Sequence, residues 1–290
     1  AAGRGRRAAL GVAGFPNLDV VRNPQLGKAP YLARFLLRKV IPLSRDRVAA
    51  ERGPLNLATS LPARRLELRI GKFSLVDFFD VNSPGSDSHL QFMNWTVDNN
   101  GAYDYAANTR GYTWGALVEY HDRRWALRFA EALMPKVANG IDLDANLTRA
   151  HSENVEMEFS PDLLHNRPTA VRLLGYVNHA NMGSYKEALD SFLAARTPVP
   201  DITAHPLRTT VKYGLGVNFQ QALNTWLTAF ARWGWNEGQH ESFAYTEVDQ
   251  TVLLGAGASG TPWRRKLDRA GFAFVSNGIS RDHQVYLARG

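Results

Sequence analysis

Apolar and polar residues alternate at every second position in several segments of this chain, and this pattern limits the possible folds more than any other feature. The cleanest run covers 211–219, where the apolar positions are Val211, Tyr213, Leu215, Val217 and Phe219. One such run arises by chance about once in a chain of this composition, so only a series of runs indicates a fold class. Further alternating segments lie at 31–38, 66–71, 112–120, 125–130, 154–159, 227–236 and 270–274. Because period-two alternation puts apolar side chains on one face of a strand, the series predicts an all-β protein.

The predicted strands are joined by connections of two lengths. Short connections lie at 121–124 and 221–224, and long polar stretches lie at 77–111, 132–150, 178–209 and 255–267. Short turns alternating with long loops are typical of an antiparallel transmembrane β-barrel, with turns at one rim and loops at the other. Within 178–209, Ser184 and Glu187 form a capping-box pattern, which predicts a short helix in this long loop.

Strand length, glycine placement and aromatic placement favour a membrane barrel over a soluble sandwich. The segments 112–120 and 211–219 match the roughly 9–11 residues with which a strand crosses the hydrocarbon layer. Glycines on the polar face would narrow the inner side-chain layer at Gly71, Gly115, Gly214, Gly216 and Gly234. Aromatic residues gather at strand ends, as in the girdles of outer-membrane barrels, at Tyr112, Trp114, Tyr120, Trp125, Trp233 and Trp235. A soluble β-sandwich or jelly roll stays open on pattern alone, because its strands alternate in the same way.

Composition narrows the functional classes. The chain of 290 residues contains no cysteine, which excludes disulfide scaffolds, thiolate metal sites and cysteine nucleophiles. No stretch approaches the run of about 18 apolar residues that a membrane-spanning helix needs. The histidines are scattered without metal-ligand spacing, so we expect no metal site. Asp77 and Asp80 are interpreted as solvated loop carboxylates rather than as a catalytic pair or calcium ligands.

The segment 64–120 carries an ordered series of motifs. In chain order these are Gly-Lys-Phe (71–73), Asp-Phe-Phe-Asp (77–80), Gln-Phe-Met-Asn-Trp (91–95), Asn-Gly-Ala-Tyr-Asp-Tyr (100–105) and Arg-Gly-Tyr-Thr-Trp-Gly (110–115). Together with 232–238 and 242–249, the series resembles the carbohydrate-selective outer-membrane porins of the OprB type. The resemblance extends from about residue 14 to the end of the chain. Counterparts of the family's signal peptide and closing strand are not found in this sequence. The arginine-rich stretch 1–9 has the charge of a signal n-region, but no apolar segment follows it.

The resemblance implies a passive channel for mono- or oligosaccharides in the outer membrane of a Gram-negative cell, with no catalysed reaction and no cofactor. Members of the family have about 16 antiparallel strands, of which this chain would supply about ten to twelve. We therefore expect residues 1–290 to form a single, partial porin β-barrel domain. Outer-membrane lipid would surround the barrel, nucleic acid would not bind, and a homo-oligomer stays open.

Side chains opposite the apolar face would point into the pore. Alternation gives this orientation to a largely charged set: Arg34, Arg38, Glu67, Arg69, Glu119, Arg128 and Arg232. Arginine is always charged and carries five hydrogen-bond donors, which suits hydroxyl and carboxylate groups. The alternative is that these arginines pair with glutamates on neighbouring strands and hold the wall together.

A second candidate set lies in the loop 88–100. It combines amides, a carboxylate and an indole, the groups that can bind sugar hydroxyls and pyranose faces: Gln91, Asn94, Trp95, Asp98, Asn99 and Asn100. Arg110, which opens the last motif of the series, is assigned to the pore lining by the resemblance. The alternative is a self-packed loop whose Asn and Asp side chains satisfy its own backbone.

Two other functions stay open. A soluble, secreted β-sheet glycan-binding protein or glycoside hydrolase would share the aromatics, the carboxylates and the alternation, but would bury its apolar face. A transporter for acidic sugars or small anions is suggested by the net charge of +7 and by the predicted pore arginines.

Overall fold

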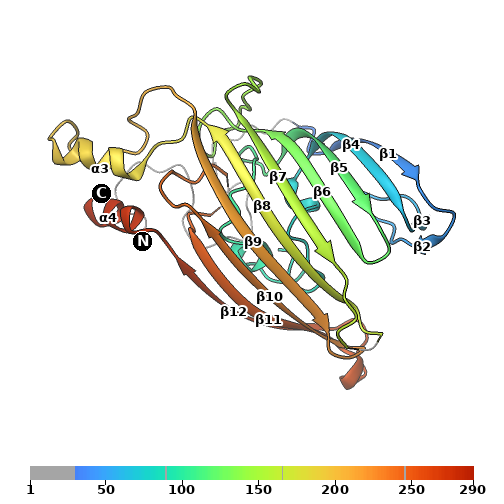
Figure 1. Ribbon diagram of the computed structural model, residues 1–290. Helices are drawn as coiled ribbons and strands as arrows, with labels where there is room; N and C mark the ends of the chain where they lie inside the picture. The colour runs from blue at the N-terminus through green and yellow to red at the C-terminus, as the bar shows by residue number, and fades with distance from the viewer. Residues whose placement is uncertain (1–29, 89, 165, 245) are drawn as a thin grey trace.

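A single sheet of ten strands dominates the computed structural model, which describes residues 30–88, 90–164, 166–244 and 246–290 (Figure 1). The stretch 1–9, His89 and His165 lie outside the described residues. In spatial order the strands are β1 (Phe35–Pro42), β4 (Arg65–Phe73), β5 (Thr113–His121), β6 (Trp125–Leu133), β7 (His151–Phe159), β8 (Thr169–Ala180), β9 (Thr210–Ala222), β10 (Leu227–Asn236), β11 (Gln250–Ser259) and β12 (Arg269–Gly278). Each strand pairs antiparallel with the next, which confirms the predicted all-β, antiparallel fold.

Apart from the long connection 43–64, the connections between the strands follow the predicted layout of short turns at one end and long loops at the other. At one end of the sheet, the turn end, the connections are 122–124, 160–168, 223–226 and 260–268. The connection 43–64 reaches the same end and contains a small hairpin of β2 (Arg47–Ala49) and β3 (Ser60–Pro62). At the opposite end, the loop end, the connections are 74–112, 134–150, 181–209 and 237–249.

Several connections contain a short helix, and another follows the last strand. The predicted loop helix is present as α3 (Tyr185–Leu193), and the Ser184 side chain accepts a hydrogen bond from the Glu187 backbone N–H at 3.5 Å. It packs against the helix that follows β12, α4 (Arg281–Arg289), through the buried Tyr185 and Tyr286. The others are η1 (Leu75–Asp77), α2 (Trp95–Asp98) and η2 (Thr261–Trp263). Within the described residues, no helix is both long and apolar enough to cross a membrane.

One predicted connection is wrong. The stretch 255–267 was expected to be a loop, but β11 continues as far as Ser259. Its small residues belong to the wall because a bulky neighbour needs the space: a Cβ on Gly255 would lie 2.5 Å from a ring carbon of Phe230 on β10. A run rich in Gly and Ala therefore marks close packing here rather than a flexible linker.

The two faces of the sheet differ in the way that the alternation predicts. The outer face exposes an apolar surface that includes Ile70, Val118, Phe129, Val155, Leu173, Leu215, Val252 and Phe274. Aromatic rings meet near both strand ends: Tyr120 and Trp125 at the turn end, with centroids 5.0 Å apart, and Tyr213 and Trp235 at the loop end, 5.9 Å apart. A continuous apolar surface of this kind is suited to contact with lipid hydrocarbon, whereas its exposure to water would be unfavourable.

The inner face is covered by the segment 74–112, which runs along the concave side of the sheet (Figure 1). Its buried side chains meet those of the strands in the main hydrophobic core, which includes Phe73, Leu75, Phe79, Trp95, Tyr103, Leu117, Leu174 and Tyr176. In the part of the chain that the structure describes, β1 and β12 pair with no further strand, so the sheet is a curved wall and not a closed ring. The core therefore lies between the wall and the segment that we call the inner loop (74–112).

Candidate functional site: the charged wall and the inner loop

A row of charged side chains crosses the inner face of the sheet from β1 to β8. This charged belt consists of Arg38, Arg65, Glu67, Arg69, Glu119, Arg128, Glu156, Glu158 and Arg172. In the register of the sheet, Glu67 lies opposite Glu119, Glu119 opposite Arg128, and Arg128 opposite Glu156. Inward-pointing positions on successive strands therefore bring residues far apart in the sequence into one continuous row.

Ion pairs connect the members of the belt. Glu67 forms ion pairs with three arginines, with N···O distances of 2.6 Å to Arg38, 2.5 Å to Arg65 and 2.5 Å to Arg69. Arg69 also pairs with Glu119, so it bridges two carboxylates that would otherwise repel each other across the strands.

Arg128 is the centre of the second half of the belt. It lies 3.1 Å from Glu119 and 2.8 Å from Glu158, and it also pairs with the fully buried Glu156. Arg172 completes the row at 3.1 Å from Glu158. Because buried carboxylates need partners, loss of one arginine would leave several charges uncompensated.

The inner loop is fastened to the wall by Asp80 and Arg232. Arg232 is 2 % exposed, and its Nε lies 2.8 Å from Asp80 Oδ2. Its guanidinium also donates to the backbone oxygens of Val97 at 2.6 Å and of Asp80 at 2.9 Å. From β9, the Asn218 amide donates to the backbone oxygen of Asp80 at 2.7 Å. Two neighbouring strands thus hold the loop at one point.

A pair of glycines provides a second attachment point for the inner loop. Gly216 on β9 lies opposite Gly234 on β10, and both face inward. The Asn100 side chain fills this space and donates from Nδ2 to the Trp233 backbone oxygen at 2.9 Å. A Cβ on Gly234 would lie only 1.9 Å from Asn100 Oδ1. The predicted thinning of the inner wall by glycine is therefore present, and the loop occupies the space.

A third attachment joins the inner loop to the connection 237–249. The Asp104 carboxylate accepts hydrogen bonds from the backbone N–H groups of Phe243, at 2.9 and 3.1 Å, and of Ala244, at 3.0 Å. The ammonium of Lys212, on β9, lies 3.5 Å from the same carboxylate and is fully buried. Asp104 and Lys212 were not predicted as anchors, although the alternation of β9 already points Lys212 inward. The interpretation of Asp80 as a solvated loop carboxylate is wrong, because its side chain is buried against Arg232.

The predicted wall residues all lie on the inner side, but with different environments. Arg38, Glu67, Arg69, Glu119 and Arg128 belong to the charged belt, whereas Arg232 lies beneath the inner loop, among the groups that fasten it. Arg34, just before β1, is exposed and pairs with Asp77 of the inner loop at 2.7 Å. Their pairing with carboxylates matches the alternative in which arginines hold the wall, and direct contact with sugars stays a prediction.

The predicted loop residues divide into exposed and buried members. Gln91 and Asn94 are exposed, and Asn94 caps α2 by accepting a hydrogen bond from the Thr96 N–H at 2.9 Å. Trp95 and Asn99 are buried in the packing of the loop. Arg110 lies with its guanidinium 3.7 Å from the centroid of the Tyr31 ring. Of the predicted sugar-contacting set, Gln91 and Asn94 are thus exposed, Asp98 is half-buried, and the rest, including Asn100, are buried.

Asp98 of the inner loop has an unusual environment. Burial raises the pKa of this carboxyl to about 7, although the nearby charge of Arg232 acts in the opposite direction. Its carboxylate accepts a hydrogen bond from the Asn99 amide at 2.9 Å. Asp98 therefore titrates near neutral pH, at the position where the loop meets its anchor.

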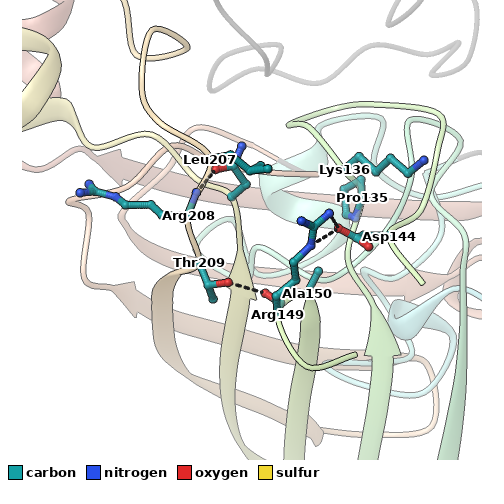
Figure 2. A pocket seen from close by; sticks show the side chains of 9 residues that line it. Pro135, Lys136, Asp144, Arg149, Ala150, Leu207, Arg208 and Thr209 are labelled. Atoms are coloured by element: carbon teal, nitrogen blue, oxygen red, sulfur yellow. Dashed lines mark hydrogen bonds and ion pairs between the residues drawn. The ribbon is translucent and has the colours of Figure 1, made fainter. Parts of the chain in front are cut away.

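A small pocket opens at the loop end, between the connections 134–150 and 181–209 (Figure 2). Its volume is about 210 Å³, and its lining residues are Pro135, Lys136, Asp144, Arg149, Ala150, Asn181, Leu207, Arg208 and Thr209. Arg149 donates to Asp144 at 2.7 and 3.0 Å, and the Thr209 hydroxyl donates to the Arg149 backbone oxygen at 3.1 Å (Figure 2). This pocket could not be predicted from the sequence, because its residues come from two loops that are separate in the chain.

The fold and the wall define the class of protein. An antiparallel sheet with an apolar outer face, a charged inner face and a long loop folded against the inner side is the wall of an outer-membrane porin. The family model for the carbohydrate-selective porins, OprB family, matches residues 55–290, so the chain belongs to this family. The family consists of outer-membrane porins and not of enzymes, which confirms the predicted localisation and decides against a glycoside hydrolase.

A solved structure shares the fold. "High pH structure of Pseudomonas putida OprB" matches with a TM-score of 0.57 at 16 % identity, and the match covers 76 % of this chain. The chain spans about half of that structure, 52 % of its length. A search of the curated proteins gave no match.

Proposed function

We propose that this protein forms part of a water-filled pore through which sugars diffuse passively across the outer membrane. The observation that carries the proposal is the charged belt, which presents a dense row of donors and acceptors on the inner face, opposite the apolar outer face. Groups of this kind replace water around sugar hydroxyls, and weak, repeated contacts allow a solute to enter and leave. Outer-membrane lipid would cover the outer face.

The charge balance of the belt favours neutral sugars over anions. Its arginines, Arg38, Arg65, Arg69, Arg128 and Arg172, are matched almost one for one by Glu67, Glu119, Glu156 and Glu158. A nearly neutral row offers no deep well for a charged solute, but it keeps its hydrogen-bonding capacity. We therefore place the transport of acidic sugars or anions second, and the net charge of +7 is what supports it.

The partly open members of the belt are the best candidates for sugar contact. Arg38 is 17 % exposed and Glu158 is 21 % exposed, more than the belt residues Arg69 and Glu156. On the inner loop, Gln91 and Asn94 add exposed amides. In this proposal, an arginine-lined wall and the amide-bearing edge of the loop face the passing sugar.

Swelling of liposomes that contain the protein, in a panel of neutral and acidic sugars, tests the proposal. We expect neutral mono- or oligosaccharides to enter faster than unrelated solutes of equal size, with a reversal potential near zero in a salt gradient. Arg38→Gln should change the relative rates among sugars, whereas Lys39→Gln, on the outer face of the same strand, should leave them unchanged. Equal rates for sugars and size-matched controls would refute carbohydrate selectivity, and strong anion selectivity would favour the second function.

A further inference from the structure

Two histidines and a glutamate meet on the outer face of the sheet, away from the charged belt. His151 and Glu153 lie two positions apart on β7 and so point to the same side, and His179 lies directly opposite His151 on β8. The two imidazole rings are stacked, with centroids 4.4 Å apart and planes inclined by 16°. The sheet register thus joins side chains that are 26 or more positions apart in the sequence, and the scattered spacing of the histidines concealed this cluster.

The distances within the cluster suit a metal ion. The Glu153 carboxylate lies 3.0 Å from His151 Nε2 and 3.6 Å from His179 Nε2, and all three candidate ligand atoms lie within 4.8 Å of one another. Ligands at 2.0–2.2 Å from a tetrahedral zinc ion are about 3.3–3.6 Å apart, so the two atoms that lie farthest apart have to close by roughly 1 Å. Two imidazoles and one carboxylate form a ligand set that zinc accepts, with the fourth position left open.

The hydrogen bonding of the cluster is incomplete. His151 Nδ1 and Glu153 Oε2 are buried, and neither has a hydrogen-bond partner among the described residues. A divalent cation bound to the two Nε2 atoms and to the Glu153 carboxylate would give Glu153 Oε2 a partner, and His151 Nδ1 would then carry the proton of the neutral imidazole.

The surroundings place the cluster at the edge of the membrane. His151 is the first residue of β7, at the loop end, where Trp114 of β5 and Tyr213 of β9 also lie on the outer face. In the sheet register, the outward neighbours of the cluster on β6 are Leu133, opposite His151, and Glu131, opposite Glu153. Aromatic residues mark the level of the lipid headgroups, so a metal ion from water can reach this site. Glu131 adds a further negative charge that favours a cation.

We propose that His151, Glu153 and His179 bind a divalent transition-metal ion, with Zn²⁺ as the expected occupant, which links β7 to β8 at the loop end of the wall. Nitrogen ligands favour Zn²⁺ over Mg²⁺ and Ca²⁺, which prefer oxygen. The ion would lie on the outer face and not in the pore. The inference is therefore independent of the proposed sugar transport.

Equilibrium dialysis of the folded protein in detergent, with Zn²⁺ alone as the probe, tests this site. We expect one Zn²⁺ per chain, little displacement by excess Mg²⁺, and weaker binding as the pH falls through about 6.5, where free imidazoles gain protons. His151→Gln, Glu153→Gln and His179→Gln should each weaken binding at least about tenfold. The matched control is His205→Gln, which removes a histidine outside the cluster whose Nε2 lies 3.9 Å from Glu241.

The outcomes separate the metal site from a plain ion-pair cluster. If the variants at positions 151, 153 and 179 bind Zn²⁺ as tightly as the unchanged protein, or if His205→Gln weakens binding equally, the site is refuted. Migration as a folded band in unheated gels shows whether each variant has assembled. Sugar flux should be the same in the His179→Gln variant and the unchanged protein, and a loss of Zn²⁺ binding without loss of flux supports a site outside the pore.

Discussion

We predict that Gly234→Ala weakens the docking of the inner loop, because the Asn100 side chain occupies the space beside this glycine. In Gly234→Ala, the new Cβ would lie 1.9 Å from Asn100 Oδ1 and 2.7 Å from its Cγ, so the Asn100 side chain has to leave its place. Its departure breaks the bond from Nδ2 to the Trp233 oxygen, at 2.9 Å, and the bond that Oδ1 accepts from the Ala102 N–H, at 3.0 Å. The substitution therefore weakens loop docking rather than the strand itself.

The magnitude follows from these contacts. Overpacking of a well-filled interior costs about 1–3 kcal/mol, and two lost hydrogen bonds cost about 0.5–1.5 kcal/mol each. We expect loop docking to weaken by about 2 kcal/mol or more, which is roughly a thirtyfold larger undocked fraction. Chymotrypsin should then cleave the inner loop faster at its aromatic residues, and single-channel current should become noisier and larger.

A matched substitution controls for the alanine itself. In Gly175→Ala, on the outer face of β8, the nearest side-chain atoms to the new Cβ are 3.5 Å away on Val155 and 3.6 Å away on Leu215, which are ordinary contacts. Cleavage and current should match those of the unchanged protein. If Gly234→Ala and Gly175→Ala behave alike, the loop is not held by Asn100. Asn100→Ala combined with Gly234→Ala should cost less than the sum of the single changes, because the clash is removed.

Three further predictions concern the outer face, the belt and the loop. Leu215→Arg puts a charge on the lipid face and should destabilise the folded protein by about 2–4 kcal/mol, with a lower folding yield in bilayers than Leu215→Ala; equal yields would contradict a lipid-facing position. Arg128→Met leaves buried carboxylates unpaired and should cost about 3–5 kcal/mol, seen as a lower temperature of unfolding on gels, whereas Arg123→Met in the exposed turn should have little effect. Burial raises the pKa of Asp98 to about 7 from its ordinary 3.8, so its contribution to docking is complete below about pH 4 and is lost as the pH rises through 7. Chymotrypsin cleavage of the inner loop should therefore increase over this range, and Asp98→Asn should abolish the change; an unchanged pH dependence would count against this titration.

Much of the wall could be predicted from the sequence, because the two faces of each strand meet different surroundings and therefore carry different side chains. The alternation at 211–219 gave both the strand and the direction of each side chain, and β9 has this arrangement. The helix at 185–193 followed from a local capping pattern, in which Ser184 and Glu187 are near neighbours in the chain. Features that depend on local periodicity or capping were thus accessible.

Features that depend on strand register were not accessible from a single sequence. Asp80 and Arg232 meet only because the inner loop crosses to the far side of the sheet, and the stacking of His151 on His179 needs the pairing of β7 with β8. The assignment of 255–267 to a loop was wrong for a related reason: position 255 needs a glycine because the ring of Phe230, on another strand, leaves no room for a side chain. Packing between strands decides these positions, and no local pattern encodes it.

The long sequence separation between the inner loop and its anchors has a consequence for the order of assembly. Asp80 contacts Arg232 across 152 positions and Asn218 across 138. Bringing such distant segments together has a large entropic cost, which the contacts can offset only after β9 and β10 have been placed beside their neighbours. The sheet should therefore form first, with the inner loop still undocked and the space beside the wall still wide. Docking of the inner loop, which narrows this space, would be among the last events of folding.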